Sequence, residues 1–262
     1  MIIVHEKTNA SLATRIAARL CCDAIELELP VFSNGEIDIK YSCGPFDRAI
    51  VIFSKTPDIN RQIVEFMMMV HMCRHCKIID AVVPYIPYSR QEKLDALPMK
   101  LLRSVITLDM HQPNGASRNI INVLPHEIFG SLFLEQKDLV IVAPDIGGRH
   151  RVSHFAAYLG TKDVVFIDKQ TGRYENMDIV NGRNCLIVDD IVDSGKTIKC
   201  AAEMLKSHGA VDVDVCVSHG FFGNYQHSLE IRKMYISESY PSSKFATRLQ
   251  MDWAMARNLL LI

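Results

Sequence analysis

Short apolar runs alternate with segments of helical periodicity along the chain. Six runs are typical of buried strands: 49–53, 78–83, 139–143, 164–167, 185–188 and 211–217. Apolar side chains recur at helical spacing over residues 60–76, 197–208 and 244–260. Continuous apolar strands separated by helices predict an α/β protein with mainly parallel sheets flanked by helices.

Two stretches follow the same plan. Residues 49–83 and residues 185–217 each read as strand, loop, helix and strand. This weak internal repeat predicts two α/β halves of similar build. The segment 125–137 is the expected break, so we place the two domains at residues 1–130 and 131–262.

Composition narrows the class of protein. The chain has 262 residues, of which 48% are hydrophobic and 23% charged, as in ordinary globular proteins. Lys and Arg number 29 against 30 Asp and Glu, so no basic field suggests a nucleic-acid partner. No signal-peptide pattern opens the chain, and no segment reaches the roughly 18 apolar residues of a membrane span. We therefore expect a cytoplasmic protein without membrane contact, whose 8 cysteines are free thiols.

One cysteine cluster has two interpretations. Cys73 and Cys76 lie close to His71 and His75, as ligands of a structural zinc ion often do. A second such pair is missing from the sequence, and this pair lies in a segment of helical periodicity. The pattern favours a helix with buried thiols, and metal binding is the alternative.

The most informative stretch follows the apolar run 185–188. Asp189 and Asp190 come first, and the short loop 193–197 then leads into a helix that should end at Gly209. Ligands of open α/β sheets bind at the carboxyl ends of strands, where backbone N–H groups and hydroxyls can surround a phosphate. The segment 195–197 also matches the end of a P-loop, but Asp190 stands where that motif needs glycine. Two carboxylates suit sugar hydroxyls or Mg²⁺ better than nucleotide phosphates, although a simple acidic turn that caps a helix remains an alternative.

The stretch 185–197 resembles the ribose-phosphate-binding loop of type I phosphoribosyltransferases. Six further segments resemble motifs of ribose-phosphate diphosphokinases in the same order: Phe32–Ile37, Val83–Lys93, Thr107–His111, Ala143–Gly148, Asp168–Lys169 and Ser218–Gly220. The resemblance implies two tandem phosphoribosyltransferase-type domains and transfer of the β,γ-diphosphate of ATP to the C1 hydroxyl of ribose 5-phosphate. It also implies a homo-oligomer, either a dimer or a hexamer of dimers, with the ATP side and subunit contacts on the first domain.

The same resemblance assigns roles to individual residues. Ribose 5-phosphate would be bound by Asp189, Asp190, Asp193, Ser194, Gly195, Lys196 and Thr197. ATP would be bound by Phe32, Asn34, Gly35, Glu36, Arg90 and Gln91. Mg²⁺ would be held near His111 and Asp145, and the catalytic cations would be Lys169 and Arg173. From the residues alone, the i, i+2 spacing places Asp109 and His111 on one face of a strand.

The chain departs from the family pattern at two places. Thr171 stands where the family has an arginine, and Arg173 is the nearest replacement. The segment 94–104 is shorter than its counterpart in the family. These differences leave two other hypotheses open: a non-catalytic relative that regulates a true synthase, and a phosphoribosyltransferase that joins a base to the sugar.

Overall fold

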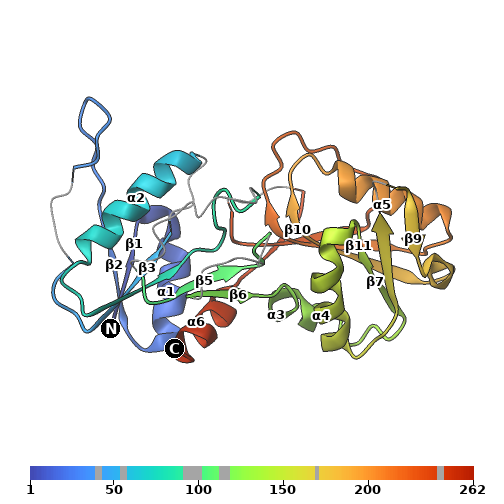
Figure 1. Ribbon diagram of the computed structural model, residues 1–262, viewed down its shortest axis with the longest axis horizontal. Helices are drawn as coiled ribbons and strands as arrows, with labels where there is room; N and C mark the ends of the chain where they lie inside the picture. Colours follow the sequence, from blue (N-terminus) through green and yellow to red (C-terminus); the bar gives the residue numbers. More distant parts are fainter. Residues whose placement is uncertain (39–42, 54–57, 91–101, 112–118, 169–170, 241–244) are drawn as a thin grey trace. The chain divides into compact units, whose positions relative to one another are not determined.

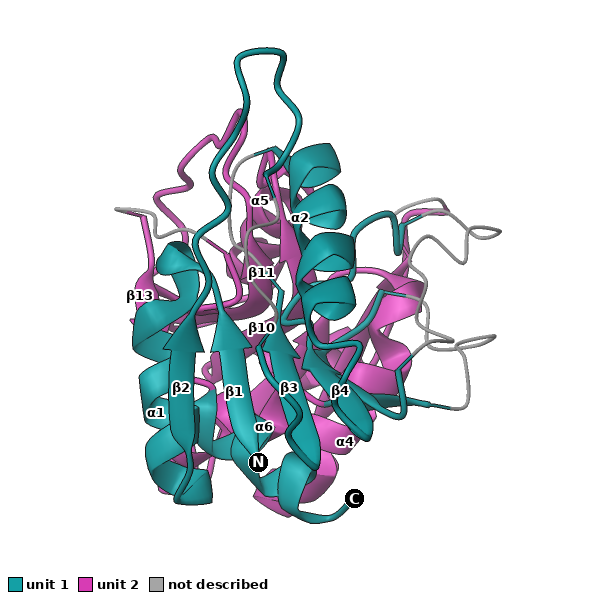
Figure 2. Cartoon of the chain, turned by 90° about the vertical axis from the view of Figure 1, so that its left-hand side faces the viewer, with its two compact units in different colours: residues 1–123, 252–262 teal, residues 124–251 magenta. Residues whose placement is uncertain are grey.

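The computed structural model describes the chain except residues 39–42, 54–57, 91–101, 112–118, 169–170 and 241–244 (Figure 1). The described residues form two compact units, one of residues 1–123 with 252–262 and one of residues 124–251 (Figure 2). Each unit is a sheet flanked by helices, which confirms the predicted fold class. Among the described helices, none combines the length and the hydropathy that a membrane crossing requires.

The first unit contains a parallel six-stranded sheet in the order β2-β1-β3-β4-β5-β6. Its strands are β1 (Ile2–His5), β2 (Asp23–Glu26), β3 (Arg48–Ile52), β4 (Ile78–Val82), β5 (Val105–Leu108) and β6 (Ile120–Val123). Its helices are η1 (Lys7–Asn9), α1 (Ala10–Leu20), α2 (Ile59–Met72) and α6 (Asp252–Leu260). Ile50 and Val51, on opposite faces of β3, are both fully buried, so both faces of this sheet are covered.

The second unit contains a seven-stranded sheet in the order β13-β12-β11-β10-β7-β8-β9, in which only the β8–β9 pair is antiparallel. Its strands are β7 (Leu139–Ala143), β8 (Val164–Asp168), β9 (Arg173–Glu175), β10 (Asn184–Val192), β11 (Val213–Gly220), β12 (Lys233–Ser237) and β13 (Thr247–Leu249). Its helices are α3 (His126–Phe129), η3 (Gly130–Leu132), η4 (Ile146–Gly148), α4 (Arg149–Leu159), η5 (Met177–Val180) and α5 (Lys196–Ser207).

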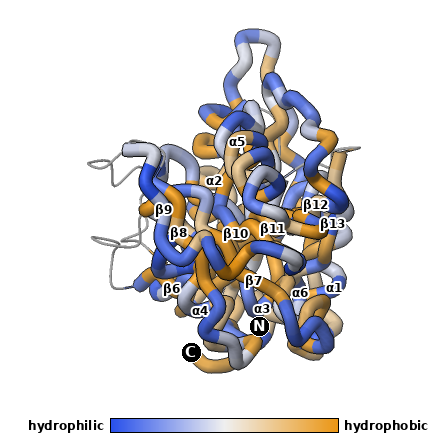
Figure 3. Tube along the Cα trace, turned by 90° about the vertical axis from the view of Figure 1, so that its right-hand side faces the viewer, coloured by the Kyte–Doolittle hydropathy of each residue, from blue (hydrophilic) through white to orange (hydrophobic). Residues whose placement is uncertain are grey.

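Alternate residues of β7 pack on opposite sides of this second sheet. Val140 and Val142 share a cluster with Ile198 and Leu205 of α5, whereas Ile141 packs with residues of α4. The strand is apolar along its whole length, as its orange colour in Figure 3 shows. Helices thus cover both faces, which is why the strand reads as a continuous apolar run and not as an alternating one.

Four of the six predicted strands agree with the structure within two residues; the run 211–217 ends three residues before β11 does, and the run 185–188 differs most. The run 185–188 is part of β10, which continues to Val192. Asp189 and Asp190 therefore lie within the strand and do not follow it. The ladder with β11 accounts for the extra length, because its register extends to the pair Val192 and Gly220. Gly209 follows α5 with φ +88°, as the predicted helix end requires.

The expected helix over 244–260 is wrong in its first part. Residues Thr247–Leu249 form β13, which pairs with β12, and the helix α6 begins only at Asp252. The expected domain limits also differ from the structure. The units divide between residues 123 and 124, and α6 belongs to the first unit although it ends the chain.

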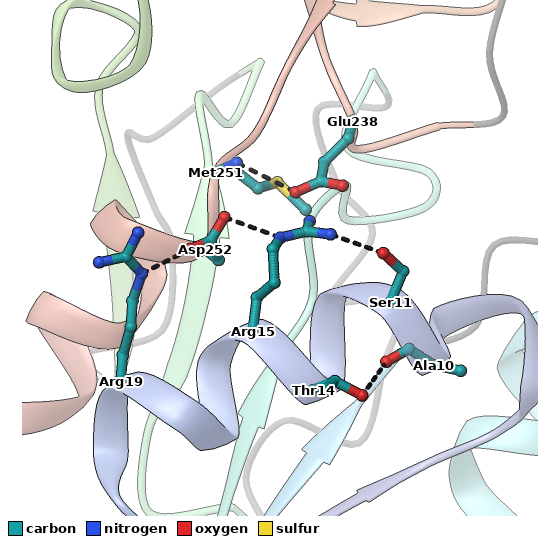
Figure 4. A network of polar contacts seen from close by, with 8 residues as sticks. All are labelled: Ala10, Ser11, Thr14, Arg15, Arg19, Glu238, Met251 and Asp252. Atoms are coloured by element: carbon teal, nitrogen blue, oxygen red, sulfur yellow. Dashed lines mark hydrogen bonds and ion pairs between the residues drawn. The ribbon is translucent and has the colours of Figure 1, made fainter.

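Polar contacts at both ends of α6 explain why it packs on the first unit. At its start, Asp252 accepts hydrogen bonds from Arg15 and Arg19 of α1 (Figure 4). At its end, Arg48 donates to the carbonyl of Leu259, 3.0 Å away. The buried residues Ala254, Met255, Ala256 and Leu259 supply the apolar contacts between these ends. A local sequence pattern cannot predict these contacts, because the partners lie more than 200 positions apart in the sequence.

Candidate functional site

The carboxyl ends of β7 and β10 mark a switch point in the second sheet. The two strands are neighbours, but the chain leaves β7 toward β8 on one side and leaves β10 toward β11 on the other. Connections that diverge in this way open a crevice at the strand ends, where open α/β sheets bind ligands. β10 pairs with β7 only up to Ile187, so Asp189 and Asp190 extend past the end of that ladder.

Asp189 and Asp190 are buried and share one arginine. Arg151 of α4, itself only 7% exposed, places its Nη1 3.7 Å from Asp189 Oδ1 and its Nη2 3.4 Å from Asp190 Oδ2. Burial, the neighbouring carboxylate of Asp190 and that of Asp145 raise the pKa of Asp189 well above its usual range, against the effect of Arg151. Two acids beside one guanidinium favour a ligand that donates hydrogen bonds or carries positive charge.

Asp145 belongs to the same group of acids. It lies one residue beyond Pro144, after β7, and its extended backbone precedes η4. A Cβ on Gly147 would lie 3.2 Å from Asp145 Oδ1, so the glycine leaves room beside the carboxylate. A Cβ on Gly148 of η4 would lie 3.7 Å from Arg151 Nη1, so the turn after Asp145 lies beside the arginine that contacts Asp189 and Asp190. The structure thus brings the predicted residues Asp145, Asp189 and Asp190 together.

The loop 193–197 is braced by the segment after β11. Gly223 donates its N–H to Asp193 Oδ1 at 3.1 Å, and Gln226 donates its N–H to the carbonyl of Ser194 at 3.1 Å. Gly195 has φ +76°, and a Cβ there would lie 2.6 Å from the Tyr225 ring. Glycine is therefore required for two reasons, its backbone conformation and the closeness of Tyr225.

The loop presents groups that suit a phosphate. Asp193, Ser194 and Lys196 are exposed, and Thr197 is half-buried. The loop leads directly into α5, whose first N–H groups have no acceptor within the helix and point toward the loop. A phosphate placed there would accept from these N–H groups and from hydroxyls, as anions do at helix N-termini.

Of the two predicted catalytic cations, Arg173 lies at the β8–β9 hairpin. Lys169 lies outside the described residues. Thr171 donates its hydroxyl to Asp168 Oδ2 at 2.7 Å and its N–H to Oδ1 at 3.3 Å. Arg173 begins β9, pairs across the hairpin with Asp168 and is exposed. Thr171 is therefore held in the turn, and Arg173 is the nearby arginine that the hairpin presents to solvent.

The predicted adenine-binding residues gather at one turn of the first unit. Val31 and Ile37 bridge the base of the turn, and Phe32 donates its N–H to the carbonyl of Glu36 at 2.8 Å. Asn34 Oδ1 accepts from the N–H of Glu36 at 3.1 Å, and Gly35 has φ +93°. Phe32, Asn34, Gly35 and Glu36 are all exposed, on a loop that projects from the body of the unit (Figure 2).

The remaining predicted residues of this unit follow other strands. Arg90 is exposed after a turn in which Tyr88 has φ +61°, and Gln91 lies outside the described residues. Asp109 and His111 do not share a strand face as expected. β5 ends at Leu108, and Asp109 has φ +42°, so the alternation stops. As a result Asp109 is buried and His111 is exposed.

The cysteine cluster is a group of buried thiols, as its preferred interpretation predicted. Helix α2 ends at Met72, so Cys73 and Cys76 follow the helix and do not lie within it. The Sγ atoms of Cys76 and Cys43 are 3.5 Å apart, and burial raises the pKa of Cys73. Desolvated thiols of this kind are poor metal ligands and nucleophiles, because both roles need the thiolate.

Arg151 and Tyr225 were not predicted from the sequence as residues of the site. Arg151 lies three residues after Gly148 in a charged segment, where a lone arginine is typical of a helix surface. Tyr225 is one of several aromatic residues after β11. The spacing of Gly147 and Gly148 was the available signal for Arg151, because a tight turn after a strand directs the next helix back over the strand ends.

Comparisons with known proteins agree with this geometry. The model of the N-terminal domain of ribose phosphate pyrophosphokinase matches residues 1–110, and the phosphoribosyl transferase domain matches residues 109–252. The ribose-phosphate pyrophosphokinase of Shewanella oneidensis is 33% identical over 81% of this chain and 76% of its own length. That of Thermosipho africanus is 28% identical over 96% and 90%, respectively.

A solved structure shares the fold. The phosphoribosylpyrophosphate synthetase of Mycobacterium smegmatis superposes with a TM-score of 0.83 over 99% of this chain and 97% of its own. The two sequences are 22% identical in this comparison, so the likeness concerns the arrangement of helices and strands.

Proposed function

The chain belongs to the ribose-phosphate pyrophosphokinase family, and we propose that it transfers the β,γ-diphosphate of ATP to the C1 hydroxyl of ribose 5-phosphate. The products are phosphoribosyl diphosphate and AMP, which serve nucleotide biosynthesis. One observation carries the assignment of the sugar site: Asp189 and Asp190 lie buried beside Arg151 at the switch point, directly before the loop 193–197.

In this proposal the second unit binds ribose 5-phosphate. The phosphate lies on the N–H groups and hydroxyls of Asp193, Ser194, Gly195, Lys196 and Thr197. Asp189 and Asp190 accept hydrogen bonds from the ribose hydroxyls, which are the donors that two acids beside one arginine favour. The braced conformation of the loop holds the anion site in place before the substrate arrives.

ATP is proposed to bind through the first unit. Phe32, 52% exposed, offers a ring face for the adenine, and the side chains of Asn34 and Glu36 read the edge of the base. Arg90 and Gln91 hold the nucleotide, with the planar guanidinium of Arg90 suited to a phosphate or to stacking on the purine.

Mg²⁺ fits the acids at the switch point. Burial and the neighbouring negative charges that raise the pKa of Asp189 also favour binding of a hard cation, which prefers oxygen ligands. In the described parts of the chain, no three His, Cys, Asp or Glu side chains form a complete metal site. Mg²⁺ is commonly held by one or two carboxylates together with substrate phosphates. We propose Asp145 of the second unit as a protein contact of this ion, which would neutralise phosphate charge when bound. His111 of the first unit is proposed separately as a metal-contacting residue.

The chain's own residues orient and stabilise the reacting groups. The C1 hydroxyl attacks the β-phosphorus in line, the bond from that phosphorus to the oxygen bridging the α-phosphate breaks, and AMP leaves. Lys169 and Arg173 are proposed to contact the transferred group, whose charge spreads over its oxygens in a loose transition state. Arg173 takes the place of the family arginine, because Thr171 at that position is held by Asp168.

Phosphorus NMR of the purified protein with ATP, ribose 5-phosphate and Mg²⁺ tests the proposal. We expect AMP and phosphoribosyl diphosphate to appear together in equal amounts. ATP that binds by calorimetry but is never consumed would contradict the activity and indicate a regulatory relative. Release of diphosphate from phosphoribosyl diphosphate only when a purine base is added would indicate a phosphoribosyltransferase.

The cellular setting is also part of the proposal. We propose a homo-oligomer, because the adenine turn with its exposed Phe32 presents apolar surface that another subunit can cover. We also propose that the protein is cytoplasmic. Light scattering of the purified protein measures the oligomer directly. A monomer at all concentrations that also turns over substrates would contradict the need for a second subunit.

A further inference from the structure

Two histidines of α4 lie outside the proposed substrate site. His150 and His154 are four residues apart, a spacing that puts both on one face of the helix. Their Nε2 atoms are 3.1 Å apart, and both side chains are exposed. Arg151, which contacts the acids of β10, is buried. The histidines therefore lie on the solvent face of the helix and have no part in the reaction described above.

We propose that His150 and His154 form a binding site for a divalent transition-metal ion such as Ni²⁺, Cu²⁺ or Zn²⁺. Two metal–nitrogen bonds of about 2.0–2.1 Å to atoms 3.1 Å apart enclose an angle of about 100° at the ion. This angle lies between the right angle of octahedral or square-planar coordination and the tetrahedral angle. Imidazole is also the side chain that these ions commonly bind in proteins.

The neighbouring side chains prepare the pair for a metal. The ring of His126 stacks on that of His154 with an angle of 8° between planes and 6.2 Å between centroids. Tyr158 in turn contacts His126 with centroids 5.4 Å apart. This stack restricts the orientation of His154, as second-sphere contacts do at metal sites.

The number of protein ligands determines which kind of metal site the two histidines can form. Among the residues described, no third His, Cys, Asp or Glu completes a cluster, so water would fill the other coordination positions. Such a site is open and exchangeable, unlike a structural zinc site with four protein ligands. It is also distinct from the Mg²⁺ site, because Mg²⁺ is a hard ion that prefers oxygen and keeps several of its waters.

Calorimetric titration of the whole protein with NiCl₂ tests the site. The buffer contains excess MgCl₂ and no nucleotide, so that oxygen-rich sites are occupied by Mg²⁺. We compare the wild type with His150→Gln, His154→Gln and the control His208→Gln, a histidine at the end of α5 in the same unit. Each α4 substitution should weaken Ni²⁺ binding by more than about tenfold, since loss of a ligand exceeds loss of a second-sphere contact. The control should bind as the wild type does.

Electron paramagnetic resonance of bound Cu²⁺ gives a second readout that does not depend on affinity. The wild type should show coupling to two imidazole nitrogens, and each α4 variant should show coupling to one. Unchanged Ni²⁺ affinity in both α4 variants would overturn the proposal. A Cu²⁺ spectrum of the wild type without paired imidazole nitrogens would overturn it too, and would show that the 3.1 Å contact is a hydrogen bond between two imidazoles.

Discussion

Each unit buries acidic side chains beside arginines, but the two units differ in how many arginines contact how many acids. In the first unit, Asp80 of β4 is fully buried and bonds to two guanidiniums, those of Arg48 and Arg103, at 2.6–3.0 Å. In the second unit, Asp189 and Asp190 share the guanidinium of Arg151 at the longer distances of 3.7 and 3.4 Å. Asp80 thus bonds to two arginines, whereas Asp189 and Asp190 both lie beside Arg151.

The difference distinguishes an acid that stabilises the fold, Asp80, from acids that can serve ligand binding, Asp189 and Asp190. Arg48 and Arg103 also donate to the carbonyls of Leu259 and Ile262, so the Asp80 cluster fastens α6 to the sheet. Asp189 and Asp190 lie side by side near Arg151, and the repulsion between the two carboxylates favours a ligand that carries positive charge or donates hydrogen bonds. A perturbed acid at a strand end is thus a better guide to function than burial alone, because Asp80 is the more buried of the two kinds.

The largest effect expected from this comparison is on stability, in the variant Asp80→Ala. It leaves two guanidiniums facing each other without their acid, which should lower the free energy of unfolding by about 3–5 kcal/mol. Urea denaturation followed by the fluorescence of Trp253, the only tryptophan, reports on α6 directly. Asp80→Asn keeps hydrogen-bond acceptance and should lose less. A wild-type unfolding curve for Asp80→Ala would show that the cluster does not hold α6.

Arg151→Gln should have a smaller effect on stability, which a ligand reverses. The substitution leaves Asp189 and Asp190 without this guanidinium, at a cost of about 1–3 kcal/mol. Protonation of Asp189, whose pKa is already raised, limits the loss. Mg²⁺ with ribose 5-phosphate should restore part of the lost stability in a thermal melt, and more so than in Asp80→Ala. Equal recovery of stability in both variants would show that the Asp80 cluster and the Asp189–Asp190 cluster do not differ in their response to the ligand.

Several central strands and the place of the loop 193–197 between β10 and α5 could be predicted from sequence, because both depend on local patterns. The apolar run 139–143 coincides with β7, and the loop leads into α5 as expected. The role of Arg151 could not be predicted, since it arises when two strands and a helix from different parts of the chain meet at a switch point. The placement of α6 likewise depends on arginines that are far away in the sequence. The turn at Asp109 depends on a left-handed backbone conformation, which the residue types at that position do not predict.

Asp190→Asn should change substrate binding more than stability. It removes one of two neighbouring carboxylates that oppose each other, so the free energy of unfolding should stay the same or rise slightly. The KM for ribose 5-phosphate should rise by about tenfold or more, equivalent to about 1.4 kcal/mol, because a charged acceptor for a sugar hydroxyl is lost. Steady-state kinetics measures the KM. An unchanged KM would remove Asp190 from the sugar site.

The smallest effects are on pH dependence, where one acid from each unit should respond in opposite directions. Burial opposes ionisation of Asp252, but hydrogen bonds from Arg19 and Arg15 outweigh it and hold its pKa below the usual range. Its stabilising contribution is therefore present above the unfolded pKa of about 3.9 and is lost as pH falls through the lower folded value. Since both arginines are partly exposed, we expect this contribution to be only about 0.5–1 kcal/mol.

Asp189 has the opposite sign because its pKa is raised in the folded state. Between about pH 3.9 and that raised value, the folded protein binds more protons than the unfolded chain, so stability falls as pH rises. The stability advantage of wild type over Asp252→Asn should shrink as the pH of a urea titration is lowered from about 4 toward about 2, whereas its advantage over Asp189→Asn should shrink as the pH is raised from about 4 toward 7. Parallel changes in the two differences would mean that the second unit compensates its acids as fully as the first, and the assignment of the switch-point acids to ligand binding would lose its physical basis.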